Sequence, residues 1–577
     1  MTSVTNDKTK AVALAEALKR LRAPYNEHYA ELQEFFLPRR GSFFGQDRID
    51  SGSKVNDRII NSTGTIALRT LQSGMHAGIT SPARPWFRLV PADEKLRHVR
   101  DVKEYLDMVQ RVMRQVFQSA GIYNSLHVSY GDLALYGTDC AILEEVVNEH
   151  SPAGGIVLRQ LEPGTFWLAA DAENRITVCY HEVALTVEQV VGQFVYGGDP
   201  SASPNWDVVS TTIRNLWTKG ARYEPVVVSR LIAPRYRGDV VLDSTPDRMP
   251  VASLWWEAGG PSDKFLRVSG YRRNPIIASR WYVSGNEIYG RSPAMDCLPD
   301  VKMLQVMERD RAEAVKRMLR PPLNAPTALR NTRFSTLPGA INFVDIDRGL
   351  TPVYQINPPI ADLRLDIKEV EERINSALYV DLFLMISLLD RRQITAREIE
   401  ERHEEKLIGL GPVLELQHKE KLRPLIFGAF ALLLEQGRIP PPPSTLRDQP
   451  LLIDYISLLA QAQKVISTGS LERFSAFIGS IAAVVPEVVD AFDVDAAARE
   501  YADLIGAPAT VLRDEDEVVT IRQARAAAMQ RQMQIEQAAK AAPAVTAVAE
   551  GARVLAESGG LGRDNVTELL RRVGVLP

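Results

Sequence analysis

The spacing of apolar residues changes twice along this chain, and that change limits its possible folds more than any single motif does. From about Leu135 to Ile288 apolar and polar residues alternate in runs such as "RITVCYHEVAL", separated by Gly, Pro, Asn and Asp. This period of two is typical of β-strands. On both sides the apolar residues recur every three or four positions, as in helices. The sequence therefore predicts an α+β fold, with a β-rich region that holds a helix or two, set between helical regions.

Two helices stand out in the flanking regions. The stretch Val99 to Ala120 carries one continuous apolar face. A longer helix follows "GRSPAMDCLPDVKML" and stops at Pro321-Pro322, because proline has no N–H for the helical hydrogen bond. We expect one side of the longer helix to pack and the other to face water. The packing side holds Val301, Leu304, Met307, Val315, Met318 and Leu319, and the charged side Lys302, Arg309, Asp310, Glu313, Lys316, Arg317 and Arg320.

The second half of the chain is mainly helical by pattern. Helical spacing returns at 360–379, and the apolar run Asp381 to Ile394 follows it. Thr395 and Glu398 form a capping box, which places a helix start after that run and makes the run itself a connecting segment. Glycines and prolines inside the next helix, Pro424 among them, predict a kink. An Ala/Gln/Arg-rich helix near the C-terminus has an apolar seam too thin for a core of its own, so we expect it to need neighbours.

Composition describes an ordinary globular protein. The 577 residues allow roughly two to four domains. The three cysteines lack the spacing of a disulfide framework or zinc ribbon, and no apolar run is long enough to span a membrane. The N-terminus reads as an amphipathic helix without a signal peptide, so we expect synthesis in the cytosol and no membrane. The net charge of −4 predicts only weak or transient contact with DNA.

Sequence patterns of catalysis are missing. The chain has no phosphate-binding loop, dinucleotide fingerprint, zinc-protease helix, nucleophile elbow or EF-hand. The eight histidines are scattered, and those next to carboxylates, such as His181 and His403, are better explained as solvated or locally paired side chains than as metal ligands. We therefore expect no catalytic residue, no cofactor and no metal.

The stretch "NSTGTIALRTLQSGMHAGITSPARPWFRL", Asn61 to Leu89, has three competing explanations: a phosphate-cradling loop, a membrane helix or a tightly packed helix. Gly74 and Gly78 fall four residues apart on one helical face, and glycines so spaced do not form a nest of backbone amides. We expect a small-residue strip that lets another backbone approach, within the same domain or from a neighbouring subunit. An ordinary core helix remains the alternative. Four residues are expected to anchor the exit: Pro82, Pro85, Trp86 and Phe87.

That stretch, "GRSPAMDCLPDVKML" and "ITAREIEERHEEKLIGLGPVLELQHKEKLRPLI" closely resemble the head-to-tail connector, or portal, proteins of short-tailed bacteriophages. The order of elements agrees from about Lys10 to Thr510. The resemblance implies a ring, typically of about twelve subunits, at one capsid vertex. It further implies a structural protein of the virion, assembled in the host cytoplasm, whose channel passes DNA during packaging and ejection.

The portal fold implied by this resemblance divides the chain into named parts. A mixed α/β wing would hold the N-terminal helices and the β-rich region, and long stem helices, a small clip and a helical crown and barrel would follow. The expected bounds are 1–290 for the wing, 291–320 for the stem helix, 321–359 for the clip, 360–380 for the second stem helix, 381–394 for a tunnel loop, 395–439 for the long kinked wing helix, 440–510 for the crown and 511–577 for the C-terminal barrel or tail.

The resemblance also implies partners: further copies of the chain, double-stranded DNA, the terminase large subunit, the tail adaptor or head-completion protein, and the major capsid and scaffold proteins. A channel for a sliding polyanion cannot hold many strong phosphate contacts, which suits the mixed charges of the stem. Those charges contact DNA or pair between neighbouring stems, and the apolar run projects toward DNA or packs between subunits. Candidate channel residues are Lys302, Arg309, Glu313, Lys316, Arg320, Leu384 and Met385.

Two other functional classes compete with the connector. A DNA-processing enzyme, such as a nuclease or packaging ATPase, is disfavoured because the sequence lacks a phosphate loop and a clustered acidic metal site. A capsid or scaffold subunit would form shells or lattices in place of closed rings. The symmetry of the purified assembly distinguishes these classes.

Overall fold

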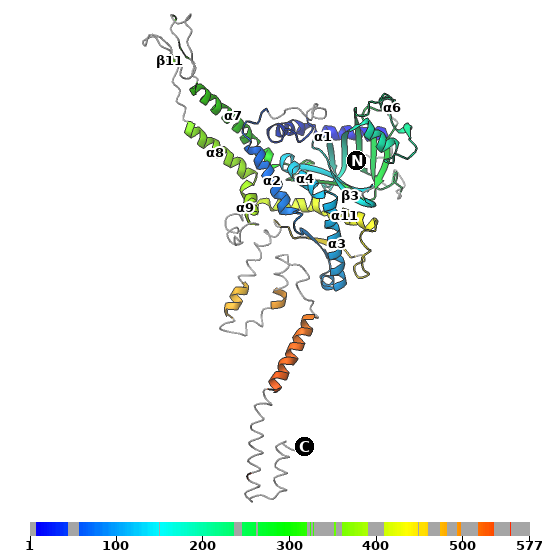
Figure 1. The fold of residues 1–577 in the computed structure, drawn as a ribbon, viewed down its shortest axis with the longest axis vertical. Coiled ribbons are helices and arrows are strands. Elements are labelled where there is room, and N and C mark those ends of the chain that lie inside the picture. Colours follow the sequence, from blue (N-terminus) through cyan, green and yellow to red (C-terminus); the bar gives the residue numbers. More distant parts are fainter. Residues whose placement is uncertain are drawn as a thin grey trace. The chain divides into compact units, whose positions relative to one another are not determined.

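A computed structural model describes residues 7–43, 57–148, 151–235, 245–260, 264–319, 323–324, 327, 351–352, 360–389, 409–447, 449–457, 459, 474–481, 493–497, 517–535 and 554. The chain divides into two compact units, Met1–Phe492 and Asp493–Pro577. Helices and antiparallel sheets occur together in the first unit, in agreement with the α+β class (Figure 1).

Helices dominate the N-terminal region, as predicted. They are α1 (Lys8–Phe35), α2 (Thr63–Ile79), η1 (Glu94–His98), α3 (Arg100–Ser119) and α4 (Ile122–Tyr136). Helix α3 begins and ends within one residue of the predicted range, and it buries Val102, Leu106, Val109, Val116 and Phe117, while Val112 is half-buried. The 3.6-residue period therefore identified the buried face correctly.

The predicted β-rich region is confirmed, and it contains two antiparallel sheets. A five-stranded sheet has the order β4-β5-β6-β7-β8, and a three-stranded sheet the order β3-β2-β9. Short helical segments lie between β5 and β6. The elements are β2 (Thr138–Asn148), β3 (Ser151–Gln160), β4 (Phe166–Ala170), β5 (Ile176–Thr186), α5 (Val187–Val190), η2 (Val191–Val195), η3 (Trp206–Val208), α6 (Thr211–Thr218), β6 (Pro225–Pro234), β7 (Val251–Glu257), β8 (Arg267–Tyr271) and β9 (Ile276–Arg280).

The two sheets share part of their core, and α1 packs on the five-stranded one. Cys140 on β2 and Cys179 on β5 are both fully buried, with their Sγ atoms 3.9 Å apart. Ala11, Ala15 and Leu18 of α1 lie in one apolar cluster with side chains of β4 to β7. The wing sheets are thus built into a continuous body with the N-terminal helix.

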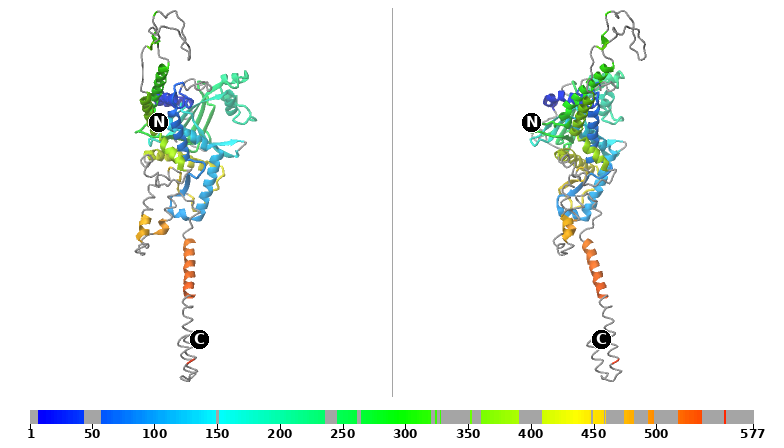
Figure 2. Two further views of the ribbon diagram at one scale, coloured as in Figure 1. Left: turned by 60° about the vertical axis from the view of Figure 1, so that its left-hand side comes forward. Right: turned by 90° about the vertical axis from the view of Figure 1, so that its left-hand side faces the viewer.

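Two long helices, α7 (Pro293–Leu319) and α8 (Ile360–Ala377), lie side by side (Figure 1 and Figure 2). A two-stranded ladder of β10 (Leu323–Asn324) and β11 (Thr351–Pro352) lies in the chain between them. Further along come α9 (Val380–Leu389), the π-helical turn η6 (His418–Leu422) and α11 (Arg423–Glu435). The other expected clip residues and the capping box at Thr395 lie outside the described residues.

One prediction for this half of the chain is wrong. The expected connecting segment Asp381 to Ile394 is helical as far as Leu389, because Tyr379 takes a left-handed backbone (φ 55°) that ends α8 and lets a new helix begin at once. The region after 440, expected to be mainly helical, also contains a strand. Strand β12 (Leu451–Tyr455) pairs with β1 (Phe87–Pro91), a strand that the helical pattern of the N-terminal region concealed.

Candidate functional site

The α7–α8 pair is buried at its base and exposed further along. Val301 and Leu304 of α7 are 1% and 0% exposed, whereas Leu319 is 77% exposed. The predicted packing side therefore packs only in part, because the later turns stay exposed among the residues that the structure describes. Met307 is half-buried, and Val315 and Met318 are exposed with Leu319. An apolar helix face left uncovered in one chain indicates contact with a further molecule.

On the charged side of α7, Lys302 contacts another helix of the same subunit. Lys302 Nζ lies 2.7 Å from a carboxylate oxygen of Glu31 on α1 and 5.6 Å from the Phe35 ring centroid. Glu313 pairs with Arg317 one turn later, and both side chains remain about half exposed. Lys302 thus helps to fix α7 against α1. Arg309 and Lys316 are exposed, while Arg320 and the side chain of Met385 lie outside the described part of the chain.

The start of the Asn61 stretch joins α2 to both long helices. Asn61 Nδ2 donates to Glu371 on α8 (2.9 Å) and to Glu308 on α7 (3.2 Å). Gln305 Oε1 accepts the backbone N–H groups of Ile60 and Asn61, and Asn61 Oδ1 accepts that of Thr63 at the start of α2. No local pattern reveals this contact, because Asn61 and Glu371 are 310 positions apart.

Gly74 and Gly78 of α2 permit a close approach, but by side chains and not by the backbone that the sequence predicted. A Cβ at Gly74 would lie 2.2 Å from ring atoms of Phe383, and one at Gly78 would lie 2.7 Å from Leu459. The stretch is therefore a packed helix within its own compact unit. Trp86 and Phe87 are buried and anchor its exit, whereas the predicted anchors Pro82 and Pro85 are exposed.

Helix α9 turns consecutive residues to opposite environments. Leu382 and Phe383 are 1% and 3% exposed and lie in the main core, while Leu384 is 51% exposed. Part of the apolar run therefore packs against α2 of the same chain, while Leu384 lies largely outside that core. Projection toward DNA and packing between subunits both stay predictions.

Where the sequence predicts a kink lies a π-helical turn, and two of its charged side chains contact α4, β2 and β9. Lys421 is fully buried, with Nζ 3.2 Å from Asp139 Oδ1 on β2 and 2.5 Å from Ser129 Oγ on α4. Its neighbour Glu420 accepts hydrogen bonds from the backbone and guanidinium of Arg280. Burial lowers the pKa of Lys421, and Asp139 opposes that effect. The turn ends before Pro424, which has no N–H for the α-helical pattern.

The described residues contain neither a metal-binding cluster nor a membrane-spanning helix. In the ranges that the structure describes, no three His, Cys, Asp or Glu side chains gather closely enough to hold a metal ion. Within the same ranges, every helix is too short or too polar to cross a bilayer. What these elements do supply is a pair of long helices fixed at one end and an apolar helix beside them.

Comparison with known proteins decides the family. The sequence pattern of the family described as "Bacteriophage head to tail connecting protein" matches residues 8–512. The chain belongs to this family. The probable portal protein of Bordetella phage BPP-1 is 38% identical over 517 residues, which cover 88% of this chain and 89% of that one. The portal protein of Salmonella phage epsilon15 is 36% identical over 559 residues, 96% of each chain.

Fold comparison adds little for this head-to-tail connecting protein. A chain from the virion of the native gene transfer agent particle aligns over 55% of this chain and 65% of its own length. The TM-score is 0.26 and the identity 11%, too low to support any argument. Family membership of the connecting protein rests on the sequence relatives.

Acid is expected to destabilise this connecting protein between about pH 6.5 and 4. Burial lowers the pKa of His418, whose ring stacks on Tyr455 at 3.8 Å, to about 4. In that pH range the unfolded chain binds a proton that the native state does not, so stability falls as pH falls. His418→Phe keeps the stacked ring and cannot be protonated. Its urea midpoint should fall less between pH 7 and about pH 5 than that of the parent. Equal losses would contradict the assignment.

Proposed function

We propose that this protein forms a closed ring at one capsid vertex, and that its channel passes genomic DNA during packaging and ejection. The observation that carries the proposal is the α7–α8 pair, in which the last turns of α7 expose Val315, Met318 and Leu319 and the start of α8 exposes Leu365 in the single chain. Neighbouring copies of the same pair would cover these side chains. Family membership supports a structural role for the chain and a place at the head-tail junction of the virion.

The parts of the ring follow from their positions in the chain. Helices α7 and α8 are the stem, 321–359 the clip that meets the terminase large subunit and later the tail adaptor, and α9 the start of the tunnel element. The long kinked helix spans the wing, 440–510 forms the crown, and 511–577 forms a barrel. About twelve copies complete the ring. Major capsid and scaffold proteins would contact its outer surface.

Exposed charges suit a channel through which DNA slides. Arg309 and Lys316 are exposed on α7, and Glu313 carries a negative charge on the same helix. Mixed signs limit the number of strong phosphate contacts, each of which would add affinity and slow the DNA. Lys302 is the exception among the proposed channel residues, since its ammonium is held by Glu31 of the same subunit.

Negative-stain imaging of the purified full chain tests the proposal. We expect particles with rotational symmetry and a central hole. Shells or lattices would instead indicate a capsid or scaffold subunit. ATP hydrolysis or DNA cleavage by the purified chain would support the alternative of a packaging enzyme and overturn the proposal.

The tunnel assignment has its own test. Leu384→Gly with Met385→Gly should lower the yield of DNA-filled heads while rings still form, since Leu384 is exposed on α9. Val12→Gly with Leu21→Gly replaces two exposed apolar residues of α1 and carries a similar helix penalty of about 1 kcal/mol per glycine. That control should package normally. Equal packaging by both variants would remove the tunnel assignment.

A further inference from the structure

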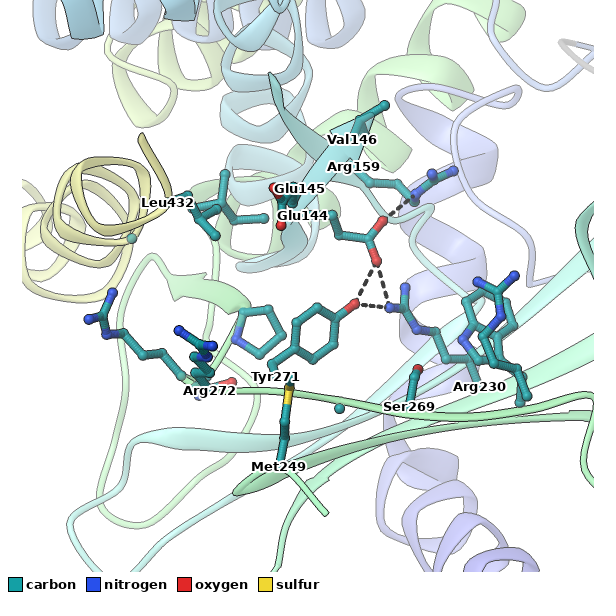
Figure 3. A pocket seen from close by; sticks show the side chains of 18 of the residues that line it. Glu144, Glu145, Val146, Arg159, Arg230, Met249, Ser269, Tyr271, Arg272 and Leu432 are labelled. Carbon is teal, nitrogen blue, oxygen red and sulfur yellow. Dashed lines mark hydrogen bonds and ion pairs between the residues drawn. The ribbon is translucent and has the colours of Figure 1, made fainter. Parts of the chain in front are cut away.

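A cleft of about 720 Å³ lies in the wing, away from the stem and α9 (Figure 3). Strands β2 and β3 form one wall, β5 to β8 the opposite wall, and α11 closes one end. The cleft exceeds twenty times the ~30 Å³ share of a water molecule in the liquid, so an inorganic anion alone would leave most of it empty. Its size is in the range of sites for larger ligands.

Cations outnumber anions inside the cleft. Glu144 accepts hydrogen bonds from Arg230 (2.6 Å), Tyr271 (2.7 Å) and Arg159 (3.2 Å), as Figure 3 shows. A further guanidinium, that of Arg267, donates to the carbonyl of Gln193 and not to a carboxylate. Three guanidinium groups thus surround one carboxylate, which leaves a local excess of positive charge.

The pKa of a buried histidine in the same cleft agrees with this excess of positive charge. Burial first, and then the charges of Arg230 and Arg159, lower the pKa of His181 to about 3. The pKa of Arg267 is also lowered, first by burial and then by Arg230. Both pKa values are lowered, and nearby positive charge lowers the pKa of a histidine or an arginine in this way.

Two more arginines stand at the mouth. The Arg272 and Arg273 side chains are 58% and 63% exposed, and each lies near Glu435 of α11, at 4.0 Å and 3.6 Å. These separations exceed hydrogen-bond length, so Glu435 holds the two guanidinium groups by charge alone. A carboxylate entering the cleft could accept shorter, charge-assisted hydrogen bonds from them.

Apolar side chains complete the lining. They come from β5, from the segments just before β7 and β9, and from α11: Val183, Leu185, Met249, Pro275 and Leu432. A nucleic-acid backbone fits poorly here, because Glu144, Glu145 and Glu435 also line the cleft and would repel successive phosphates. Alternating carboxylates and apolar side chains, in contrast, would match both kinds of lining. We propose that this cleft docks a short acidic peptide segment with interspersed apolar residues, contributed by another protein.

Fluorescence anisotropy with the full chain tests the proposal. The probe is a short fluorescein-labelled peptide of alternating glutamate and leucine, and the control peptide has glutamine in place of glutamate. Arg272→Gln with Arg273→Gln should weaken binding of the acidic peptide about tenfold or more, because charge-assisted contacts are lost. Arg100→Gln with Arg111→Gln makes the same charge change on exposed positions of α3, which does not line the cleft, and should leave binding unchanged.

Each other outcome overturns the proposal. Absence of binding would show that the cleft has no such ligand. Equal binding of the glutamine peptide would show that carboxylates are not recognised, and equal loss in the α3 control would show non-specific attraction. If a duplex DNA oligonucleotide displaced the peptide and lost affinity in the Arg272 and Arg273 variant, the cleft would be a nucleic-acid site.

Discussion

Lys421→Met is expected to lower the free energy of unfolding by about 3–5 kcal/mol, because it leaves Asp139 buried without its cation. Asp139 is 1% exposed and also accepts hydrogen bonds from Ser129 and Ser279, neither of which carries a charge. Methionine fills most of the space of the lysine stem, so the loss would come from the unpaired carboxylate and not from a cavity. Urea denaturation followed by circular dichroism measures the change.

A neighbouring lysine provides the control. Lys419 lies in the same π-helical turn and is exposed, so Lys419→Met should change stability by less than about 0.5 kcal/mol. Combining Lys421→Met with Asp139→Asn should recover part of the loss, because the amide is neutral. If Lys421→Met were as stable as Lys419→Met, the buried pair would not hold the kinked helix to the wing.

Gly74→Val is expected to destabilise the protein and to disturb α9 in particular. The new Cβ would lie 2.2 Å from Phe383, so either α9 or α2 must move. Overpacking of this kind costs about 1–3 kcal/mol, and Phe383→Ala alone should cost about 3–5 kcal/mol because Phe383 is buried. The double variant should lose less stability than the sum of the two single losses, because the valine then occupies part of the space left by the ring.

Both stability and DNA packaging should be measured for this pair. Because α9 begins the proposed tunnel element, Gly74→Val should also lower the yield of DNA-filled heads, and Phe383→Ala should restore part of it. Gly409→Val is the control, because a Cβ at Gly409 meets nothing within 4 Å. Strictly additive stability losses would mean that Gly74 and Phe383 do not share one packing space.

Sequence periodicity predicted the elements whose partners are local. Helix α3 and the strands between 135 and 288 were found because each repeats its own pattern. Periodicity failed where an element depends on the backbone conformation of one residue or on a partner far away in the sequence. The left-handed Tyr379 starts α9 at once, and β1 acquires its strand partner only from β12. Neither event leaves a trace in a window of neighbouring residues.

The candidate site residues show the same difference between local patterns and distant partners. Gly74 and Gly78 were recognised from spacing alone, because a small-residue strip has one common structural use. Lys302 was placed correctly on the charged side of α7, but its partner Glu31 comes from another helix. Lys421 was missed entirely. A lysine within a helix is usually solvated, and only the fold shows that Asp139 and Ser129 enclose it.

The pairing of β1 with β12 also determines how mechanical force would enter the protein. Tyr455 pairs with Phe87, and the N–H of the next residue, Ile456, donates to the carbonyl of Trp86. A pull on the chain beyond Ile456 would therefore be borne first by backbone hydrogen bonds to a strand whose start is anchored by two buried aromatic rings. Tension from the C-terminal side would reach the core through β1, and through the contact of Tyr455 with His418 it would also reach the turn that precedes α11.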